Sequence, residues 1–221
     1  MHVYAGASGT ATAVQDASDT ATTDAPSFVE PDEQITGFAY DPFTDHFFLR
    51  LAPGNRIRVV DRPARAIKRE FVVAGLPATG GGDLTVRPRD GHLFLLPPAG
   101  REIAEVTRLG KLTRTFELAG IAGVPRGIAY DSGAGRLLVL NADGRRVTAH
   151  DFDGRRLGEF DLEREGGAAL AIDADKREIY APLAGEKGIV GVFNETGRLL
   201  RTLALPAAFV DVGPRSFVRV F

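Results

Sequence analysis

The sequence predicts an all-β protein built from a repeated four-stranded unit, and three observations support this fold class. Five similar stretches, each with an apolar run, a polar turn and a second apolar run, recur along the chain from Gly37, Leu84, Gly127, Leu170 and Val210. Their matching positions are 46, 44, 42 and 40 residues apart, at Asp41, Arg87, Asp131, Asp173 and Gly213. A period of about 40–45 residues is the length of one β-propeller blade. No segment shows a helical apolar period with capping residues.

The third repeat gives the order of strands and turns within one unit. Gly127–Tyr130 is a short apolar run, as expected for an inner strand that is buried on both faces. Arg136–Leu140 is rich in branched apolar residues and predicts the second strand. The turn Asn141-Ala-Asp-Gly144 predicts a hairpin, and alternating residues place two outer strands at 145–150 and 155–162. The same four-strand cycle is expected in residues 35–76, 82–120, 126–164 and 168–205.

The two chain ends together predict one more blade. Phe209–Val212 and Phe217–Phe221 supply two strands, and His2–Gln15 aligns with the third and fourth strands of the third repeat. Closing the ring would pair two sheet edges that are otherwise open. We therefore expect one domain over residues 1–221, a five-bladed β-propeller whose last blade is shared by N- and C-terminal strands. Residues 1–15 would close the ring, 16–33 would form an acidic linker and 34–221 the repeats; an incomplete six-bladed propeller is the alternative.

Composition and charge narrow the class of protein. The chain has no cysteine, which excludes disulfides, thiol catalysis and Cys-ligated zinc, and no apolar run approaches the roughly 20 residues of a membrane helix. Residues 1–33 hold six acidic and no basic side chains, so the remainder carries a charge of +4. That charge is far below that of a nucleic-acid binder. We expect a monomer without a nucleic-acid partner or a membrane span.

The arginine content indicates a bacterial source. Arginine outnumbers lysine 23 to 4, as GC-rich bacterial codon usage produces. Residues 1–30 carry no signal-peptide pattern, which is compatible with a mature chain whose signal was removed. A periplasmic or secreted location is favoured over a cytoplasmic one.

Motifs in the first and third repeats resemble the NHL-type propeller repeat. They are Val124–Asp131, Arg136–Val147 and the segment Gly54–Asp61 with its Asn-Arg-Ile. The chain is also similar in style to bacterial YncE-like propellers. It departs from the pattern at Arg87, where aspartate is usual, and at Pro182 after the second strand of the fourth repeat. The resemblance implies a propeller that binds a protein, RNA or a cell-envelope component; a few members are hydrolases or lyases.

Polar residues are expected at one mouth of the central channel. The connections into the inner strands and the loops between second and third strands share this face, and ligands usually bind there. The candidate ligand-binding residues are Arg50, Asp83, Arg126, Asn141 and Glu186. No catalytic residue is assigned, because the chain has no Gly-x-Ser-x-Gly motif and no recognisable Ser-His-Asp spacing. We expect a non-catalytic scaffold for a protein or cell-envelope ligand, without a cofactor.

The alternative function is a divalent-metal-dependent hydrolase or lactonase of the gluconolactonase type. Resemblance to such enzymes implies carboxylate and amide oxygens around a cation at the channel mouth, and oxygen ligands suit calcium. Glu33, Asp83 and Asn141 are the candidate metal ligands. The residues that surround the glutamate in that family are absent here.

Overall fold

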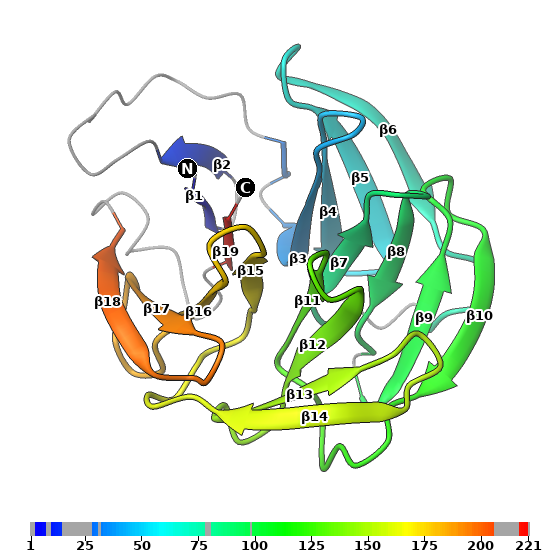
Figure 1. The fold of residues 1–221 in the computed structure, drawn as a ribbon. Helices are drawn as coiled ribbons and strands as arrows, with labels where there is room; N and C mark the ends of the chain where they lie inside the picture. The colour runs from blue at the N-terminus through cyan, green and yellow to red at the C-terminus, as the bar shows by residue number, and fades with distance from the viewer. Residues whose placement is uncertain are drawn as a thin grey trace.

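The protein is an all-β propeller (Figure 1). The structure, a computed structural model, describes residues 3–7, 10–14, 28–30, 32–77, 81–97, 99–205 and 217–220, and for the strands 3–7, 10–14 and 217–220 it describes the backbone. These residues form 19 strands and no helix. None of the described segments is a helix capable of crossing a bilayer.

Four blades are complete antiparallel sheets of four strands. The first contains β3 (Gln34–Asp41), β4 (His46–Ala52), β5 (Arg56–Asp61) and β6 (Ala66–Val72). The second contains β7 (Leu84–Arg87), β8 (His92–Leu95), β9 (Glu102–Val106) and β10 (Leu112–Glu117). The third contains β11 (Gly127–Asp131), β12 (Arg136–Leu140), β13 (Arg146–His150) and β14 (Arg156–Asp161). The fourth contains β15 (Ala171–Asp173), β16 (Glu178–Pro182), β17 (Ile189–Asn194) and β18 (Leu199–Ala204).

The strands predicted for the third repeat are confirmed to within one residue at each end. In this blade the first three strands are mostly buried, and the outermost strand is exposed on most of its residues. Inner strands of neighbouring blades approach closely: a Cβ on Gly127 would lie 2.6 Å from the backbone of Leu170. The small residue that opens this inner strand therefore permits the contact between blades three and four.

Apolar cores lie between the blades rather than within them. Ile128, Leu137 and Val139 of the third blade pack against Phe94 and Ile103 of the second. Equivalent clusters join the first blade to the second and the third to the fourth. Both faces of the second and third blades are thereby covered, as sheet packing requires.

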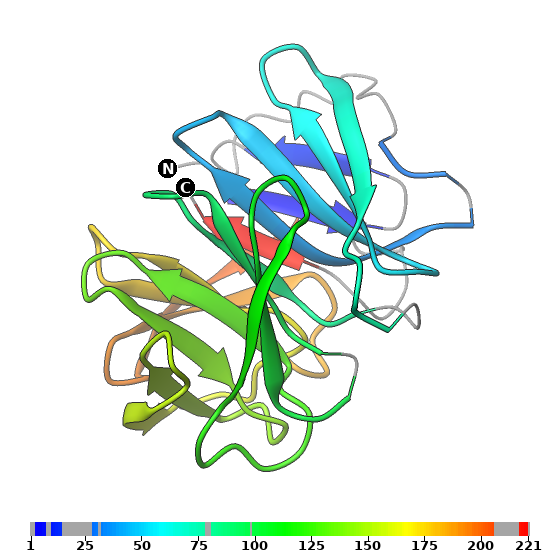
Figure 2. The ribbon, with the colours of Figure 1, turned by 90° about the vertical axis from the view of Figure 1, so that its right-hand side faces the viewer.

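The two chain ends meet in one sheet. β1 (Val3–Ala7) pairs with β2 (Thr10–Val14) and with β19 (Phe217–Val220), so that Val3 lies opposite Val220. β19 lies beside β15 and β3, the inner strands of the fourth and first blades (Figure 1). Figure 2 shows the two blue N-terminal strands close to the red C-terminal strand.

The predicted pairing of N- and C-terminal strands is thus present, but in a sheet of three strands rather than four. The described residues form four complete blades, and the predicted count of five is not confirmed. The expected inner strand 209–212 lies outside the described residues, as does most of the acidic linker. At the end of that linker Phe28 and Val29 are buried against the first blade.

A β-bulge recurs at the same place in every complete blade. The pairing register between the third and fourth strands shifts by one residue, and the fourth strand contains the extra residue: Lys68, Thr113, Leu157 or Leu200. Bulges twist a strand and disturb its edge, which discourages pairing with another chain.

Candidate functional site

Arg50, a predicted ligand residue, is buried at the junction of the first two blades. It lies on β4 and is 1% exposed. Its Nε and Nη2 atoms each donate to Asn55 Oδ1 at 3.1 Å, and Nη1 donates to the carbonyls of Gly82 (3.3 Å) and Leu96 in the second blade. A Cβ on Gly81 would lie 2.0 Å from Arg50 Cζ, so only glycine allows the guanidinium to pack there. Burial lowers the pKa of Arg50 to about 10, although Asp83 opposes this shift.

Asp83 joins the second blade to the third. Its carboxylate is 2% exposed and accepts hydrogen bonds from the backbone amides of Leu84 (2.9 Å) and Ile128 (3.0 Å). Two residues further along, Thr85 Oγ1 accepts from the amide of Tyr130 at 3.1 Å. Asp83, directly before β7, and Thr85 on β7 therefore satisfy backbone donors along the edge of β11.

Arg126 joins the third blade to the fourth. Its guanidinium donates to the carbonyl of Ala142 (2.7 Å), to Glu165 (3.0 Å) and to the carbonyl of Gly166 (3.0 Å). Arg50, Asp83 and Arg126 thus each make bonds between consecutive blades at the predicted channel mouth. Asn141 Oδ1 accepts from Thr148 Oγ1 at 3.2 Å within the third blade, and Glu186 of the fourth blade pairs with Arg164, which lies in the segment that connects the third blade to the fourth.

The three candidate metal ligands have separate partners. Glu33 is 4% exposed and accepts bonds from both Nη atoms of Arg58 at 2.7 and 2.9 Å, while Arg56 lies 2.6 Å away. Burial raises the pKa of Glu33, but the bonds from Arg58 and from the Glu30 amide outweigh it, so the pKa is lowered overall. Within the described ranges no three His, Cys, Asp or Glu side chains are grouped to hold a metal. Calcium binding remains a prediction.

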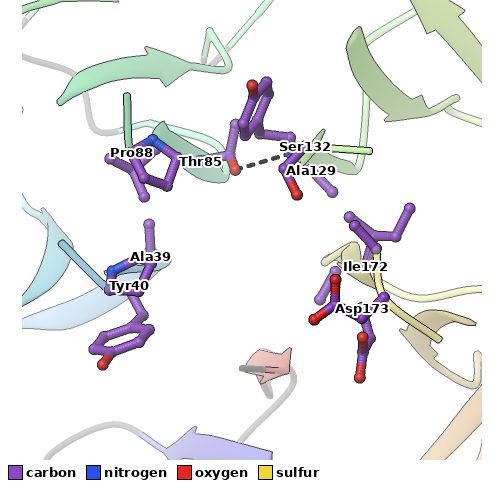
Figure 3. A pocket seen from close by; sticks show the side chains of 14 residues that line it. Ala39, Tyr40, Thr85, Pro88, Ala129, Ser132, Ile172 and Asp173 are labelled. Carbon is purple, nitrogen blue, oxygen red and sulfur yellow. Dashed lines mark hydrogen bonds between the residues drawn. The ribbon is translucent and has the colours of Figure 1, made fainter. Parts of the chain in front are cut away.

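The central cavity opens at the other end of the inner strands. It measures about 290 Å³ and is lined by all four complete blades. Figure 3 shows its labelled residues around one central space: Ala39, Tyr40, Thr85, Pro88, Ala129, Ser132, Ile172 and Asp173. The small side chains of Ala39, Ala129 and Ala171 lie on inner strands and leave room on the axis.

The polar lining of this cavity differs between blades. The fourth blade contributes Asp173 and Asp175, and the second and third contribute the hydroxyls of Thr85 and Ser132. Asp173 also accepts a bond from the Lys176 amide at 3.0 Å, and the Lys176 ammonium lies 3.5 Å from its other oxygen. Asp175 is exposed and has no ion-pair partner in the part of the chain that the structure describes. One side of the cavity is therefore acidic.

Three of the four complete blades have an aspartate at the end of the inner strand, and the second blade has an arginine. The turns that border the cavity explain this difference. Asp41, Asp131 and Asp173 each accept a backbone amide of the turn that follows the inner strand, at 3.0–3.1 Å. In the second blade Arg87 replaces the aspartate and lies 2.9 Å from Glu105, with its Cζ 4.5 Å from the Phe152 ring centroid. Asp90 stabilises this turn instead, because its carboxylate accepts a hydrogen bond from the backbone amide of His92 at 3.1 Å.

Sequence reasoning did not select the cavity residues, because it favoured the opposite end of the channel. A usable signal was present in the aligned inner strands. The inner strands end at Asp41, Arg87, Asp131 and Asp173, and the residues that follow, Pro42, Pro88, Ser132 and Ala174, all line the cavity at the same end of the channel.

The chain is similar in fold to propellers of diverse activity. A glutaminyl cyclase from Myxococcus xanthus matches with a TM-score of 0.61 and 16% identity, over 77% of this chain and 70% of that one. A streptogramin B lyase matches with a TM-score of 0.54 and 18% identity, over 93% of this chain but only 60% of the lyase. A chain of a nidogen–laminin complex matches with a TM-score of 0.62 and 14% identity, over 99% of this chain and 97% of that one.

These structural matches show the propeller fold. They do not distinguish an enzyme from a binding protein. No protein-family model matches the sequence, so membership of the NHL or YncE-like groups remains a prediction. The search of curated proteins also found no match.

Proposed function

We propose that this protein is a non-catalytic binding propeller, and that its central cavity receives a basic side chain from an exposed segment of a partner protein. The observation that carries the proposal is the convergence of four blades on a cavity of about 290 Å³ with Asp173 and Asp175 on one side. A concave site lined by one sign of charge concentrates the field and attracts the opposite charge.

The shape of the lining supports a side chain as the ligand. Alanines of three inner strands and Pro42, Pro88 and Ile172 provide apolar walls for an aliphatic stem. The hydroxyls of Thr85 and Ser132 provide acceptors for additional guanidinium or ammonium donors. The propeller from the nidogen–laminin complex, which matches over nearly its whole length, supports protein binding as one use of a scaffold of this size.

We also propose that the ring is five-bladed and that the chain-end sheet is its fifth blade. The position of β19 beside both β15 and β3 supports this arrangement. So do the buried apolar faces of the first and fourth blades, which include Phe47, Leu49 and Val192 and flank the chain-end sheet.

The second candidate is the calcium-dependent hydrolase with Glu33, Asp83 and Asn141 as ligands. Carboxylate and amide oxygens are suitable calcium ligands, which favours this candidate. The same oxygens already accept hydrogen bonds from Arg58, the Ile128 amide and Thr148, which opposes it. Millimolar calcium would raise the melting temperature of such an enzyme; the binding proposal expects no shift.

The proposed function is tested with a matched pair of peptides. Acetyl-Gly-Arg-Gly-amide should bind the purified protein at least about tenfold more tightly than the same peptide with neutral citrulline, because a charge-assisted hydrogen bond contributes about 1.5–3 kcal/mol. Asp175→Lys should abolish this preference, and Asp32→Lys, an equal charge change at an exposed residue outside the cavity, should preserve it. Equal binding of both peptides would refute the proposal.

A further inference from the structure

A second cavity, of about 270 Å³, lies between the first and second blades at the opposite end of the propeller from the central one. Its walls are mostly apolar and come from Leu76, Pro77, Leu95, Pro97 and Ala104. Arg50 and Asn55 form its polar part. The cavity therefore combines an aliphatic wall with a guanidinium group.

The charge of Arg50 is not neutralised by direct contact. Its acceptors are the Asn55 amide and two backbone carbonyls, and none of its partners among the described residues is a carboxylate. The carboxylate of Asp83 affects Arg50 only through space and is itself bonded to two backbone amides. Buried charges are usually paired, because an unpaired one is costly to remove from water.

Asn55 occupies the position where an acidic partner would bind. Its single Oδ1 accepts from both Nε and Nη2 of Arg50, the pair of donors that a carboxylate would bridge with two oxygens. The guanidinium has five N–H groups. Four are used in the described bonds, which leaves one on Nη2 for a ligand.

We propose that this cavity binds a small monocarboxylate with a short aliphatic chain, whose carboxylate pairs with Arg50 and whose chain packs on Leu76, Leu95 and Ala104. The volume lies just below the range of about 300–1,000 Å³ typical of ligand pockets, which favours a small ligand. Glu102 also lines the cavity and would repel a second anionic group, so a dicarboxylate fits less well than a monocarboxylate. This site is independent of the central cavity and of its proposed partner.

The probe is butyrate, compared with butyramide, which has nearly the same shape and no charge. The full-length protein, labelled with 15N, is titrated with each compound while backbone amides and the Arg50 Nε–H are followed by NMR. Butyrate should shift Arg50 Nε–H and the amides of Leu95, Leu96 and Ala104 in a saturable manner, and butyramide should bind at least about tenfold more weakly. Equal shifts from both compounds, or none that saturate, would overturn the proposal.

Two variants make the test independent of folding defects. Asn55→Asp places a carboxylate on the same two Arg50 donors, so it should raise the melting temperature and abolish butyrate binding. Ala99→Trp fills the exposed rim of the cavity without touching Arg50 and should also abolish binding. Ala64→Trp, in an exposed turn away from the cavity, should leave binding unchanged. Butyrate binding that survives both Asn55→Asp and Ala99→Trp would refute the site.

Discussion

The carboxylate of Asp83 accepts a hydrogen bond from the backbone amide of Ile128, 45 residues later in the chain, at 3.0 Å. The bond joins the second blade to the third, and the two blades also meet through the bond from the Tyr130 amide to Thr85 Oγ1 and through apolar side chains. β11 is the edge strand of its sheet, so the Ile128 amide has no partner strand on this side, and Asp83 accepts its hydrogen bond instead. Polar contacts of this kind set the position of one blade relative to the next.

Asp83→Ala should lower the free energy of unfolding by about 2–4 kcal/mol, because it removes the acceptor of two buried amides and a negative charge that stabilises the Arg50 cation. Asp143→Ala is the matched control. Asp143 also accepts two backbone amides, but within one exposed turn, so its loss should cost about 1 kcal/mol. Urea unfolding monitored by circular dichroism measures both values. Equal losses of unfolding free energy in the two variants would show that the buried position of Asp83 between the blades adds nothing to stability.

His150 makes stability depend on pH near neutrality. It is fully buried, and burial lowers its pKa below the ordinary value of 6.5. The unfolded chain therefore takes up a proton before the folded protein does, so stability is complete above pH 6.5 and falls as the pH drops below it. The slope is at most about 1.4 kcal/mol per pH unit.

His150→Phe introduces the residue found at the equivalent position of the fourth blade, Phe193. The Gly154 carbonyl, which faces His150 Nδ1, keeps its bond from the Ala119 amide at 2.9 Å. Melting temperatures between pH 7.5 and 5.5 should therefore vary less in the variant than in the wild type. Buried carboxylates such as Glu105 have lowered pKa values and lose stability only at more acidic pH, so they do not produce this effect. If the melting temperatures of the wild type and the variant changed equally between pH 7.5 and 5.5, His150 would not be the cause of the pH dependence.

Glu33 attaches the segment before the first blade. Arg58 binds its carboxylate and also donates to the Phe28 carbonyl at 2.6 Å. Glu33→Gln should speed hydrogen exchange at Phe28, Val29 and Glu30, and should lower stability by about 2–4 kcal/mol because a buried charge pair is broken. Asp32→Asn, at the exposed neighbouring residue, is the control and should change neither.

Deletion of residues 1–15 tests the ring of five blades. The deletion removes β1 and β2 and leaves β19 without its strand partner. The melting temperature should fall by at least about 10 °C, since about 1 kcal/mol corresponds to 2–4 °C in a chain of this size. A synthetic peptide of residues 1–15 added in trans should restore part of the loss. An unchanged melting temperature would contradict the proposed closure.

The repeat was predictable because each blade is a local unit. Apolar alternation and the turn at Asn141–Gly144 placed the strands of the third blade, and the shared pattern placed the others. The bulges at residues such as Leu157 were not predictable, because a one-residue shift in register leaves no mark in an exposed strand of mixed composition.

The candidate site was harder to predict than the fold. Asp83 and Arg126 lie directly before the inner strands β7 and β11, and Arg50 lies near the end of β4, and each of the three bonds to backbone groups of the next blade. Backbone acceptors and donors have no residue type, so no spacing in the sequence points to them. The central cavity depends on how four inner strands converge, and this arrangement follows only from the closed ring.

The most direct test of the central claim is the location of the arginine peptide on the protein. In a 1H–15N correlation spectrum of the full-length chain, saturating acetyl-Gly-Arg-Gly-amide should shift the amides of Ala39, Thr85, Ala129 and Ile172, which line the central cavity. The citrulline peptide should leave them in place. Shifts confined to residues outside this cavity, or identical responses to both peptides, would contradict binding of a basic side chain on the propeller axis.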